Sequence, residues 1–341
     1  MLIFIAITAA LAGAVYLLRR RKIAKPLLLL CSLSLCFTAA ETYFRFFYVR
    51  SDGFARLSKN FADRYYKIDA FGLRASNLPP SEEKPNLVLL GDSHVFGAGL
   101  KQPSERLSEQ LAVHYPQLHV VNLGYPGWDT RTQTEQLTQH LGNAGARIPL
   151  IVLAYFFNDI EEDVTPADRE RLAPPVQPEQ PTVLDRILQK AAVYSRFVEL
   201  FYYRIGYPRL VRDRLEQIRT FYQDAEIRQR HLTTLERLRE VAREQYSANL
   251  LVVLLPYLHS EELLNRVEFY APFRAALGAR GFESIDLQPV FATHGASRLI
   301  VHRFDPHTNA FANQLAAKEV VSYLDSHPAM LQATPAPAAR E

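Results

Sequence analysis

From residue 85 onwards, short apolar runs alternate with amphipathic stretches, and this alternation limits the fold more than any other feature of the chain. The runs are rich in Val, Leu and Ile and are bounded by Gly, Pro or Asp; they cover residues 86–90, 118–123, 149–154, 249–255 and 282–287. Amphipathic stretches separate them, for instance residues 104–114, 130–141 and 232–244. Strands that are apolar throughout need cover on both faces. The pattern therefore predicts an α/β fold with a parallel sheet between two layers of helices.

The composition of the 341-residue chain excludes two other classes of protein. A hydrophobic content of 48% with a net charge of only +3 excludes a disordered chain. Two cysteines, Cys31 and Cys36, are too few for a small domain held together by disulfides. Because the net charge is close to zero, we expect no nucleic acid as a partner.

The N-terminal part, residues 1–49, contains two apolar runs. Residues 2–18 carry no charge, a second run begins at residue 27, and Arg19, Arg20, Arg21 and Lys22 stand between them. Short loops rich in Lys and Arg stay in the cytoplasm, so we expect a two-helix transmembrane anchor in the cytoplasmic (inner) membrane, with the remaining chain on the outer, periplasmic side. A signal peptide carries its positive charge before the apolar core rather than after it. A single anchor is the alternative.

The rest of the chain divides into four segments. We expect a linker over residues 50–84, the sheet domain over residues 85–326, a helical insertion within it at 160–228, and an unstructured tail at 327–341. Residues 186–219 of the insertion hold eight Arg or Lys against three acids, Glu199, Asp213 and Glu216, and so have a net charge of +5. This basic segment is either a helical cap on the sheet or a lid that touches the bilayer or an acidic lipid headgroup.

Four polar motifs follow the predicted strands. Gly91-Asp92-Ser93-His94 comes after the first strand, Asn122-Leu123-Gly124 closes the second, Asn158-Asp159 follows the third, and Asp305-Pro306-His307 comes after the last. Ligands of open α/β sheets collect where the strands end. These residue types are the ones that acyl transfer needs: a serine nucleophile, a histidine base, an aspartate that orients the histidine, and N–H donors for an oxyanion.

The four motifs, in this order, resemble those of the SGNH, or GDSL-type, hydrolases over about residues 86–325. The resemblance implies a flavodoxin-like three-layer sandwich with about five parallel strands, action on ester bonds, and no metal or organic cofactor. It assigns Ser93 as the nucleophile, His307 as the base and Asp305 as its orienting partner. It also assigns the oxyanion hole to the Ser93 N–H, Gly124 and Asn158.

Two positions depart from the family pattern. Phe156 stands where the third motif, Gly-x-Asn-Asp, has its glycine, which affects the shape of the pocket beside the oxyanion. Asp305 and His307 are two positions apart, whereas the family usually spaces them by three. Asp-x-His also occurs in relatives that modify cell-surface glycans, so we interpret the short spacing as a variant of the motif.

The expected function is that of a membrane-anchored serine esterase that forms an acyl-enzyme on Ser93. The same residues would also serve an O-acyltransferase or deacetylase acting on a cell-surface polysaccharide or lipid-linked glycan. A third alternative is a catalytically silent scaffold that binds a glycan. The expected partners are an ester or acylated-glycan substrate and the lipid bilayer.

Overall fold

The computed structural model describes residues 1–52, 56–142, 146–172, 183–266 and 270–332. The chain forms two compact units. The first, called the anchor unit after the anchor expected at its N-terminus, comprises Met1–Arg64 and Val176–Val211, and the sheet unit comprises Tyr65–Pro175 and Arg212–Glu341. All the residues that the sequence assigns to a catalytic site belong to the sheet unit.

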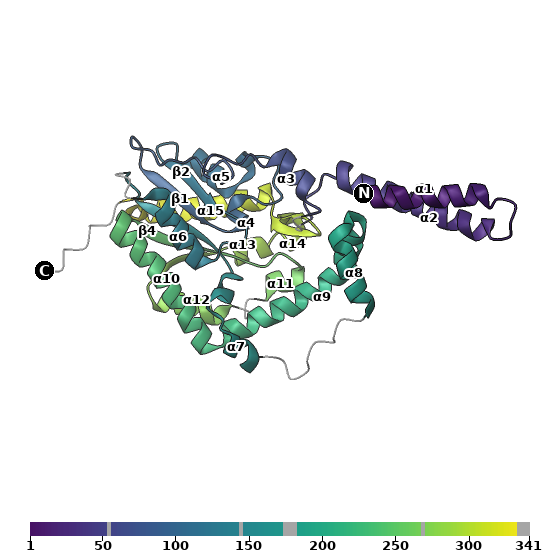
Figure 1. Ribbon diagram of the computed structural model, residues 1–341. Helices are drawn as coiled ribbons and strands as arrows, with labels where there is room; N and C mark the ends of the chain where they lie inside the picture. Colours follow the sequence, from purple (N-terminus) through teal and green to yellow (C-terminus); the bar gives the residue numbers. More distant parts are fainter. Residues whose placement is uncertain (53–55, 143–145, 173–182, 267–269, 333–341) are drawn as a thin grey trace. The chain divides into compact units, whose positions relative to one another are not determined.

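Five parallel strands form the centre of the sheet unit, in the order β2-β1-β3-β4-β5 (Figure 1). The strands are β1 (Asn86–Gly91), β2 (His119–Gly124), β3 (Leu150–Phe156), β4 (Asn249–Leu255) and β5 (Glu283–Asp286). This is the strand order of flavodoxin-like sheets, and it confirms the predicted fold class. In the register, Gly91 lies opposite Gly124 on one side and Ala154 on the other. Strands β1 and β2 therefore end level and β3 runs two residues further, so the motifs that follow them start from one edge of the sheet.

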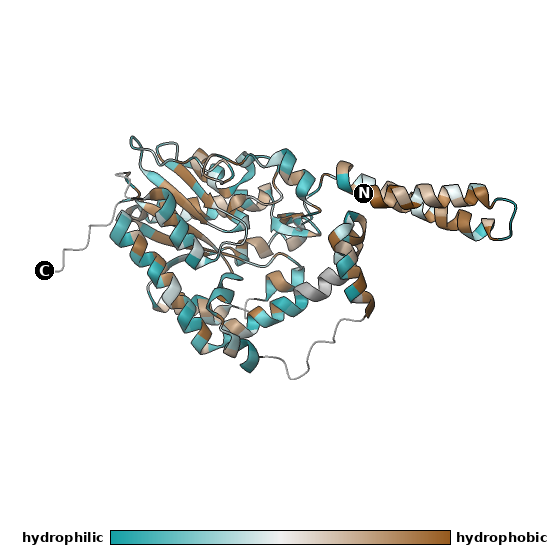
Figure 2. Ribbon diagram, in the orientation of Figure 1, coloured by the Kyte–Doolittle hydropathy of each residue, from teal (hydrophilic) through white to brown (hydrophobic). Residues whose placement is uncertain are grey.

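Helices cover both faces of this sheet, as the apolar strands require. Leu87 and Leu89 of β1 join one apolar core with α5 (Leu107–His114) and α15 (Ala310–Ser326). The alternate residues Val88 and Leu90 are equally buried on the other face, where α6 (Thr130–Leu141) and α10 (Ala225–Tyr246) lie. In Figure 2 the strands form a hydrophobic layer, while the outer sides of these helices are hydrophilic.

Shorter elements complete the sheet unit: α4 (Ser93–Phe96), η2 (Pro103–Glu105), η3 (Asp159–Asp163), α7 (Pro166–Arg171), α11 (Glu261–Asn265), α12 (Ala271–Ala279), α13 (Gln288–Ala292), α14 (Ala296–Leu299), β6 (Ile300–His302), β7 (Asp305–Thr308) and η5 (Pro328–Leu331). Strands β6 and β7 form an antiparallel hairpin that the sequence analysis does not anticipate. The turn η5 also differs from the expected unstructured tail, because Met330 is buried in the core and Asn249 donates to the carbonyl of Met330 at 3.1 Å. The rest of the predicted tail, residues 333–341, lies outside the described residues.

The anchor unit is helical. Its elements are α1 (Leu2–Leu17), α2 (Ala24–Thr42), η1 (Tyr43–Phe47), α3 (Lys59–Tyr65), α8 (Val183–Tyr194) and the first part of α9 (Arg196–Gln223). Helices α1 and α2 lie side by side, and Thr8 Oγ1 is 2.7 Å from Ser34 Oγ (Figure 1). Glu41 and Arg45 are four positions apart and so lie on one helical face, where they form an ion pair at 2.6 Å. Glu41 also accepts from Ser195 Oγ at 2.8 Å, so the end of α2 is joined to the turn between α8 and α9.

One helix of the described residues, Ala24–Phe47, is long and apolar enough to cross a membrane, judged by length and composition alone. A signal sequence near an N-terminus passes the same test. The 16 residues of α1 would span about 24 Å, which is less than the hydrocarbon core of about 30 Å. The structure thus supports one N-terminal apolar helix, which is either a signal or a single anchor. It does not by itself support a second crossing of the membrane by α1.

The predicted insertion at 160–228 divides between the two units. Helix α7 belongs to the sheet unit, whereas α8 and the first part of α9 belong to the anchor unit. Residues 173–182 lie outside the described residues. Among the basic side chains, Arg204 is 3.6 Å from Asp52 Oδ1 and 3.3 Å from Tyr48 Oη within the anchor unit. Its charge is therefore matched by a carboxylate of the protein itself.

Candidate active site

Ser93 is the first residue of α4, directly after the turn that leaves β1. The Asp92 carboxylate accepts a hydrogen bond from the His94 backbone N–H at 2.9 Å and so caps the short helix. The turn is tight: a Cβ on Gly91 would lie 2.5 Å from Val95 Cγ2 and 3.0 Å from the carbonyl oxygen of Ala154. Glycine at position 91 lets the chain reverse here with the Ser93 hydroxyl at the edge of the sheet.

The β6–β7 hairpin brings a histidine and an aspartate to this hydroxyl. His307 Nε2 lies 2.9 Å from Ser93 Oγ, and His307 Nδ1 is hydrogen-bonded to Asp305 Oδ1. The Asp305 side chain is fully buried, while that of His307 remains 21% exposed. With the Nδ1–H donated to the carboxylate, Nε2 carries the lone pair that accepts the serine proton. The structure thus places Ser93, His307 and Asp305 in one hydrogen-bonded line.

Asp305 is held closely by the loop after α4. Gly99 has a φ of +80°, and a Cβ there would lie 2.8 Å from Asp305 Oδ2 and 2.6 Å from Val301 Cγ2. The absence of a side chain at this position lets the loop and the β6–β7 hairpin approach each other. This close contact positions the acid relative to the strand end that carries Ser93.

The charges of the site favour a protonated His307 and neutral histidines around it. Burial by itself would lower the pKa of His307, but the charge and hydrogen bond of Asp305 outweigh it and hold that pKa above its ordinary value. Burial and the neighbouring His307 charge lower the pKa of His94 well below normal, and they lower that of His259 to about 4. Burial also raises the pKa of Asp92 to about 6. His307 is therefore the histidine suited to hold a proton during a reaction.

The two predicted oxyanion residues differ in their surroundings. Gly124 ends β2, and a Cβ on it would lie 2.4 Å from the Phe96 nitrogen, so glycine allows α4 to pack against this strand end. Its backbone N–H donates to Asn122 Oδ1 at 3.1 Å, and an oxyanion would have to share or replace that bond. Asn158 follows β3, and its Oδ1 is buried without a hydrogen-bond partner among the described residues.

Aromatic residues surround the site. Phe156 has its ring 4.7 Å from that of His94 and 5.0 Å from that of Tyr257. It occupies space beside His94 that a glycine would leave open. Glu162, Asp163 and His231, which belong to none of the contacts around Ser93, are the described side chains that could hold a metal ion.

Two buried arginines that the sequence analysis did not single out support this site. The Arg74 guanidinium donates to the carbonyl oxygens of Gly97 and Leu100 in the loop after α4. Arg106 in turn donates to the carbonyl oxygen of Arg74. Arg74 comes from the segment predicted as a linker, and an isolated arginine there carries no sequence pattern that distinguishes it from an exposed one. Arg74 thus satisfies backbone carbonyls of the loop that approaches Asp305, and Arg106 holds the backbone of Arg74 itself.

Comparisons with known proteins give distant likenesses. No protein-family profile matches the chain, and no curated protein sequence does. Among solved structures, a carbohydrate acetylesterase family member from Sinorhizobium meliloti is 15% identical, covers 73% of this chain and 99% of its own, and has a TM-score of 0.39. A lipolytic protein of the G-D-S-L family from Veillonella parvula is 12% identical, with coverages of 70% and 98% and a TM-score of 0.41. A lipase/acylhydrolase from Enterococcus faecalis is 14% identical, with coverages of 71% and 96% and a TM-score of 0.40.

Proposed function

We propose that the sheet unit is a serine esterase of the SGNH type and that it acts through an acyl-enzyme on Ser93. The single observation that carries the proposal is the hydrogen-bonded line from Ser93 Oγ through His307 to Asp305, with 2.9 Å between Oγ and Nε2. A serine hydroxyl is a weak nucleophile unless a base takes its proton, and an imidazole oriented by a buried carboxylate is such a base.

In the proposed reaction, Ser93 Oγ attacks the carbonyl carbon of an ester while its proton passes to His307 Nε2. His307 then gives this proton to the departing alcohol, and the acyl group remains on Ser93. Water attacks the acyl-enzyme and loses a proton to His307, which returns this proton to Ser93 Oγ as the bond to the acyl group breaks and the free acid leaves. Asp305 orients the imidazole and stabilises its charged form throughout. The raised pKa of His307 favours the proton-bearing intermediate.

The oxyanion of each tetrahedral intermediate would be bound by the Ser93 N–H, the Gly124 N–H and the Asn158 amide. In Asn158 the donor would be the amide nitrogen, and the amide oxygen, which is an acceptor, would have to face away from the oxyanion. Removing one donor of this kind costs on the order of 100- to 1,000-fold in rate. Gly124 contributes once its N–H turns from Asn122 to the oxyanion.

The test replaces Ser93 with Ala and measures hydrolysis of short p-nitrophenyl esters together with labelling by a fluorophosphonate probe. We expect the wild type to hydrolyse the esters and to be labelled, and S93A to do neither. Ser297→Ala is the matched control, because Ser297 is an exposed serine of the same unit. Equal hydrolysis and equal labelling of S93A and the wild type would refute the proposal.

The acyl acceptor is tested separately, since the same acyl-enzyme could pass its acyl group to a sugar hydroxyl. We propose water as the acceptor. With an acetyl ester as donor and a glycan added, free acetate should then account for the whole acetyl group. Acetyl found on the glycan would assign the protein to the O-acyltransferases. Failure of the fluorophosphonate probe to label a folded protein that still binds a glycan would favour the scaffold.

We further propose that α1 and α2 both cross the cytoplasmic membrane and leave the sheet unit on its outer side. The four basic residues Arg19 to Lys22 between the two helices support a cytoplasmic turn, and the Thr8–Ser34 contact supports their pairing. Protease added to intact bacterial spheroplasts should digest the sheet unit. Protection of the sheet unit until the membrane is lysed would contradict this topology.

A further inference from the structure

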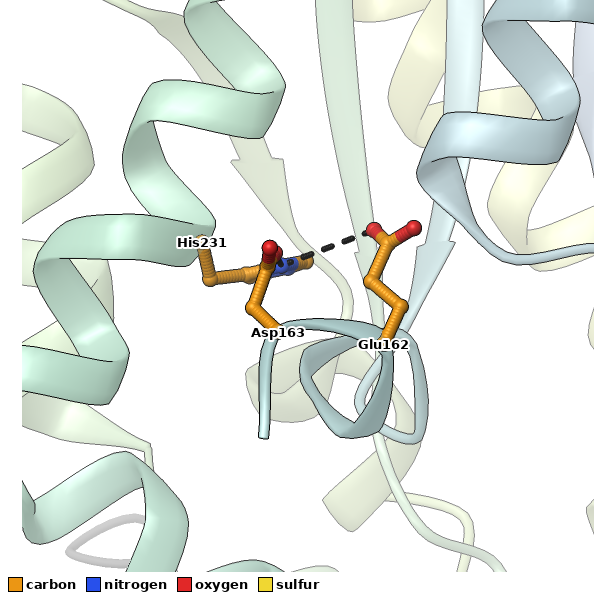
Figure 3. A group of neighbouring side chains, drawn as sticks. All are labelled: Glu162, Asp163 and His231. Atoms are coloured by element: carbon orange, nitrogen blue, oxygen red, sulfur yellow. Dashed lines mark hydrogen bonds and ion pairs between the residues drawn. The ribbon is translucent and has the colours of Figure 1, made fainter. Parts of the chain in front are cut away.

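Three side chains of the sheet unit converge at the turn that follows Asn158. Glu162 and Asp163 close η3, and His231 projects towards them from α10 (Figure 3). His231 Nδ1 lies 2.9 Å from Asp163 Oδ2 and 3.7 Å from Glu162 Oε1, and one ligand atom from each residue lies within 4.8 Å of the others. The three side chains are between 0% and 7% exposed. Nitrogen and oxygen atoms at these separations can share one small cation.

A buried chain of hydrogen bonds fixes which nitrogen of His231 carries its proton. The Tyr222 hydroxyl donates its only proton to the carbonyl oxygen of Phe157 at 2.9 Å. The Tyr155 hydroxyl, in contact with that of Tyr222, must therefore donate to Tyr222. Since Tyr155 has then used its proton, the 2.8 Å contact between its oxygen and His231 Nε2 requires an Nε2–H donor. A neutral His231 thus presents the lone pair of Nδ1 to the Asp163 carboxylate.

Two acceptors facing each other at 2.9 Å repel unless a positive charge lies between them. A proton on Nδ1 would satisfy His231 and Asp163, but it would leave Glu162 Oε1, which is buried and has no hydrogen-bond partner among the described residues. The Glu162 side chain is only 4% exposed. A divalent ion would instead bind Nδ1 and both carboxylates at once, and so accounts for all three atoms.

We propose that His231 Nδ1, Asp163 and Glu162 bind a divalent transition-metal ion of the Zn²⁺ class. One imidazole nitrogen with carboxylate oxygens is a common ligand set for such ions, whereas Mg²⁺ prefers oxygen ligands alone. The Nε2–H of His231 donates to Tyr155, as the second ring nitrogen of a metal-bound histidine typically donates to a fixed acceptor. The proposal does not depend on the proposed esterase activity.

A route for the ion lies between α6 and α10. An open groove of about 680 Å³ is lined by residues of both helices, including Arg131, Thr134, Thr234 and Arg237. Two of these also contact the cluster, since Arg131 pairs with Asp163 at 3.0 Å and the Thr234 hydroxyl donates to the same carboxylate. Arg131 is 60% exposed, so its guanidinium can move into solvent when an ion takes its place.

The ion would act by joining η3 to α10. Glu162 and Asp163 lie four and five positions after Asn158, on the same turn. Because the ion binds only the folded chain, it should raise the melting temperature, and the rise should grow as the Zn²⁺ concentration exceeds Kd. This readout is independent of catalysis.

The experiment uses the full chain, purified in detergent, stripped with a chelator and dialysed. Isothermal titration with Zn²⁺ and, for comparison, Mg²⁺ measures binding, and thermal unfolding with and without Zn²⁺ measures its effect on stability. We expect the wild type to bind one Zn²⁺ in preference to Mg²⁺ and to melt at a higher temperature with it. Glu162→Gln, which keeps the shape of the side chain, should weaken Zn²⁺ binding by at least about tenfold. Its melting temperature without metal shows whether it folds.

Glu161→Gln is the matched control. Glu161 is the preceding residue and pairs with Arg214 at 2.8 Å outside the cluster, so E161Q should bind Zn²⁺ as the wild type does. The rival arrangement is a neutral Glu162, because burial raises the pKa of its carboxyl group to about 8. In that arrangement the wild type and E162Q melt alike and neither responds to Zn²⁺. That result, or equal Zn²⁺ affinity in the wild type and E162Q, would overturn the proposal.

Discussion

Asp305 and His307 stand two positions apart on the extended strand β7, and the carboxylate of the first accepts a hydrogen bond from Nδ1 of the second. Side chains of a strand alternate between its two faces, so a spacing of two places both on the same face. A spacing of three on the same strand would point them to opposite faces. The spacing of two therefore agrees with the local backbone.

Replacing Asp305 with Asn should abolish most of the activity without unfolding the protein. The amide would no longer hold the proton on Nδ1, so Nε2 would lose the lone pair that accepts the serine proton. We expect kcat for a p-nitrophenyl ester to fall by about 1,000- to 10,000-fold with little change in KM. Asp325→Asn is the control, because Asp325 is exposed and bonded to Tyr115 away from Ser93. A D305N enzyme within tenfold of the wild type would contradict the role of Asp305.

The pH dependence of the activity should report the raised pKa of His307. The base must be neutral to accept the serine proton, so kcat/KM should rise with pH through a midpoint above the ordinary value of 6.5. The same raised pKa means that His307 stabilises the fold at low pH, and this contribution is lost as the pH rises through the folded-state pKa. A profile of kcat/KM from pH 5 to 9 measures the midpoint. A midpoint at or below 6.5 would show that Asp305 does not stabilise the imidazolium.

Replacing Asp92 with Asn should stabilise the protein at neutral pH. Burial raises the pKa of Asp92 from 3.8 to about 6, so the folded state binds this proton more tightly than the unfolded state. Protonated Asp92 therefore contributes to the stability of the wild type below about pH 4. This contribution is lost as the pH rises through the folded-state pKa of about 6. The amide oxygen introduced by the substitution can still accept from the His94 N–H. Urea unfolding should show D92N to be more stable by up to about 3 kcal/mol at pH 8.

The control for this comparison is Asp63→Asn, because Asp63 is largely exposed. D63N should follow the wild type at both pH values, and D92N should lose its advantage at pH 4. If D92N were less stable than the wild type at pH 8, the Asp92 carboxylate would be charged and stabilising in the folded protein.

Replacing Gly124 with Ala should destabilise the strand end and displace Ser93. The new Cβ would meet the Phe96 nitrogen at 2.4 Å and the Val95 carbonyl carbon at 2.6 Å, both of them backbone atoms of α4. We expect a loss of about 1–3 kcal/mol in the free energy of unfolding, measured in urea, and reduced ester hydrolysis. Gly278→Ala, on α12 with nothing within 4 Å of the new Cβ, should instead stabilise the protein by up to about 1 kcal/mol.

The sheet could be predicted because strands β1 to β4 are buried on both faces, and each predicted apolar run overlaps a strand. The run at residues 249–255 coincides with β4. The proximity of Ser93 to His307 could be anticipated from strand ends that share one edge. The β6–β7 hairpin could not, since β7 contains Asp305, Pro306 and His307 and has no apolar alternation. The hairpin packs against the loop around Gly99 through Val301 and Asp305, and no local pattern records that contact.

The buried polar groups were the least predictable part of the structure. Arg74 and Arg106 are buried because their guanidinium groups meet backbone carbonyls of a loop, and such partners are visible only after folding. His231 lies on an amphipathic helix where a histidine is usually exposed, and it is buried because Tyr155 and Asp163 arrive from β3 and η3. Single residues of this kind depend on long-range partners rather than on periodicity.

The hairpin that carries Asp305 and His307 pairs with no strand of the five-stranded sheet in the described part of the chain. Its length and its tip can therefore vary without shifting the register of the sheet that holds Ser93. For protein engineers, the hairpin tip at residues 303–304 is the segment to exchange: grafted loops there reshape the surface beside His307 while Val301 and Asp305 keep their fit against Gly99.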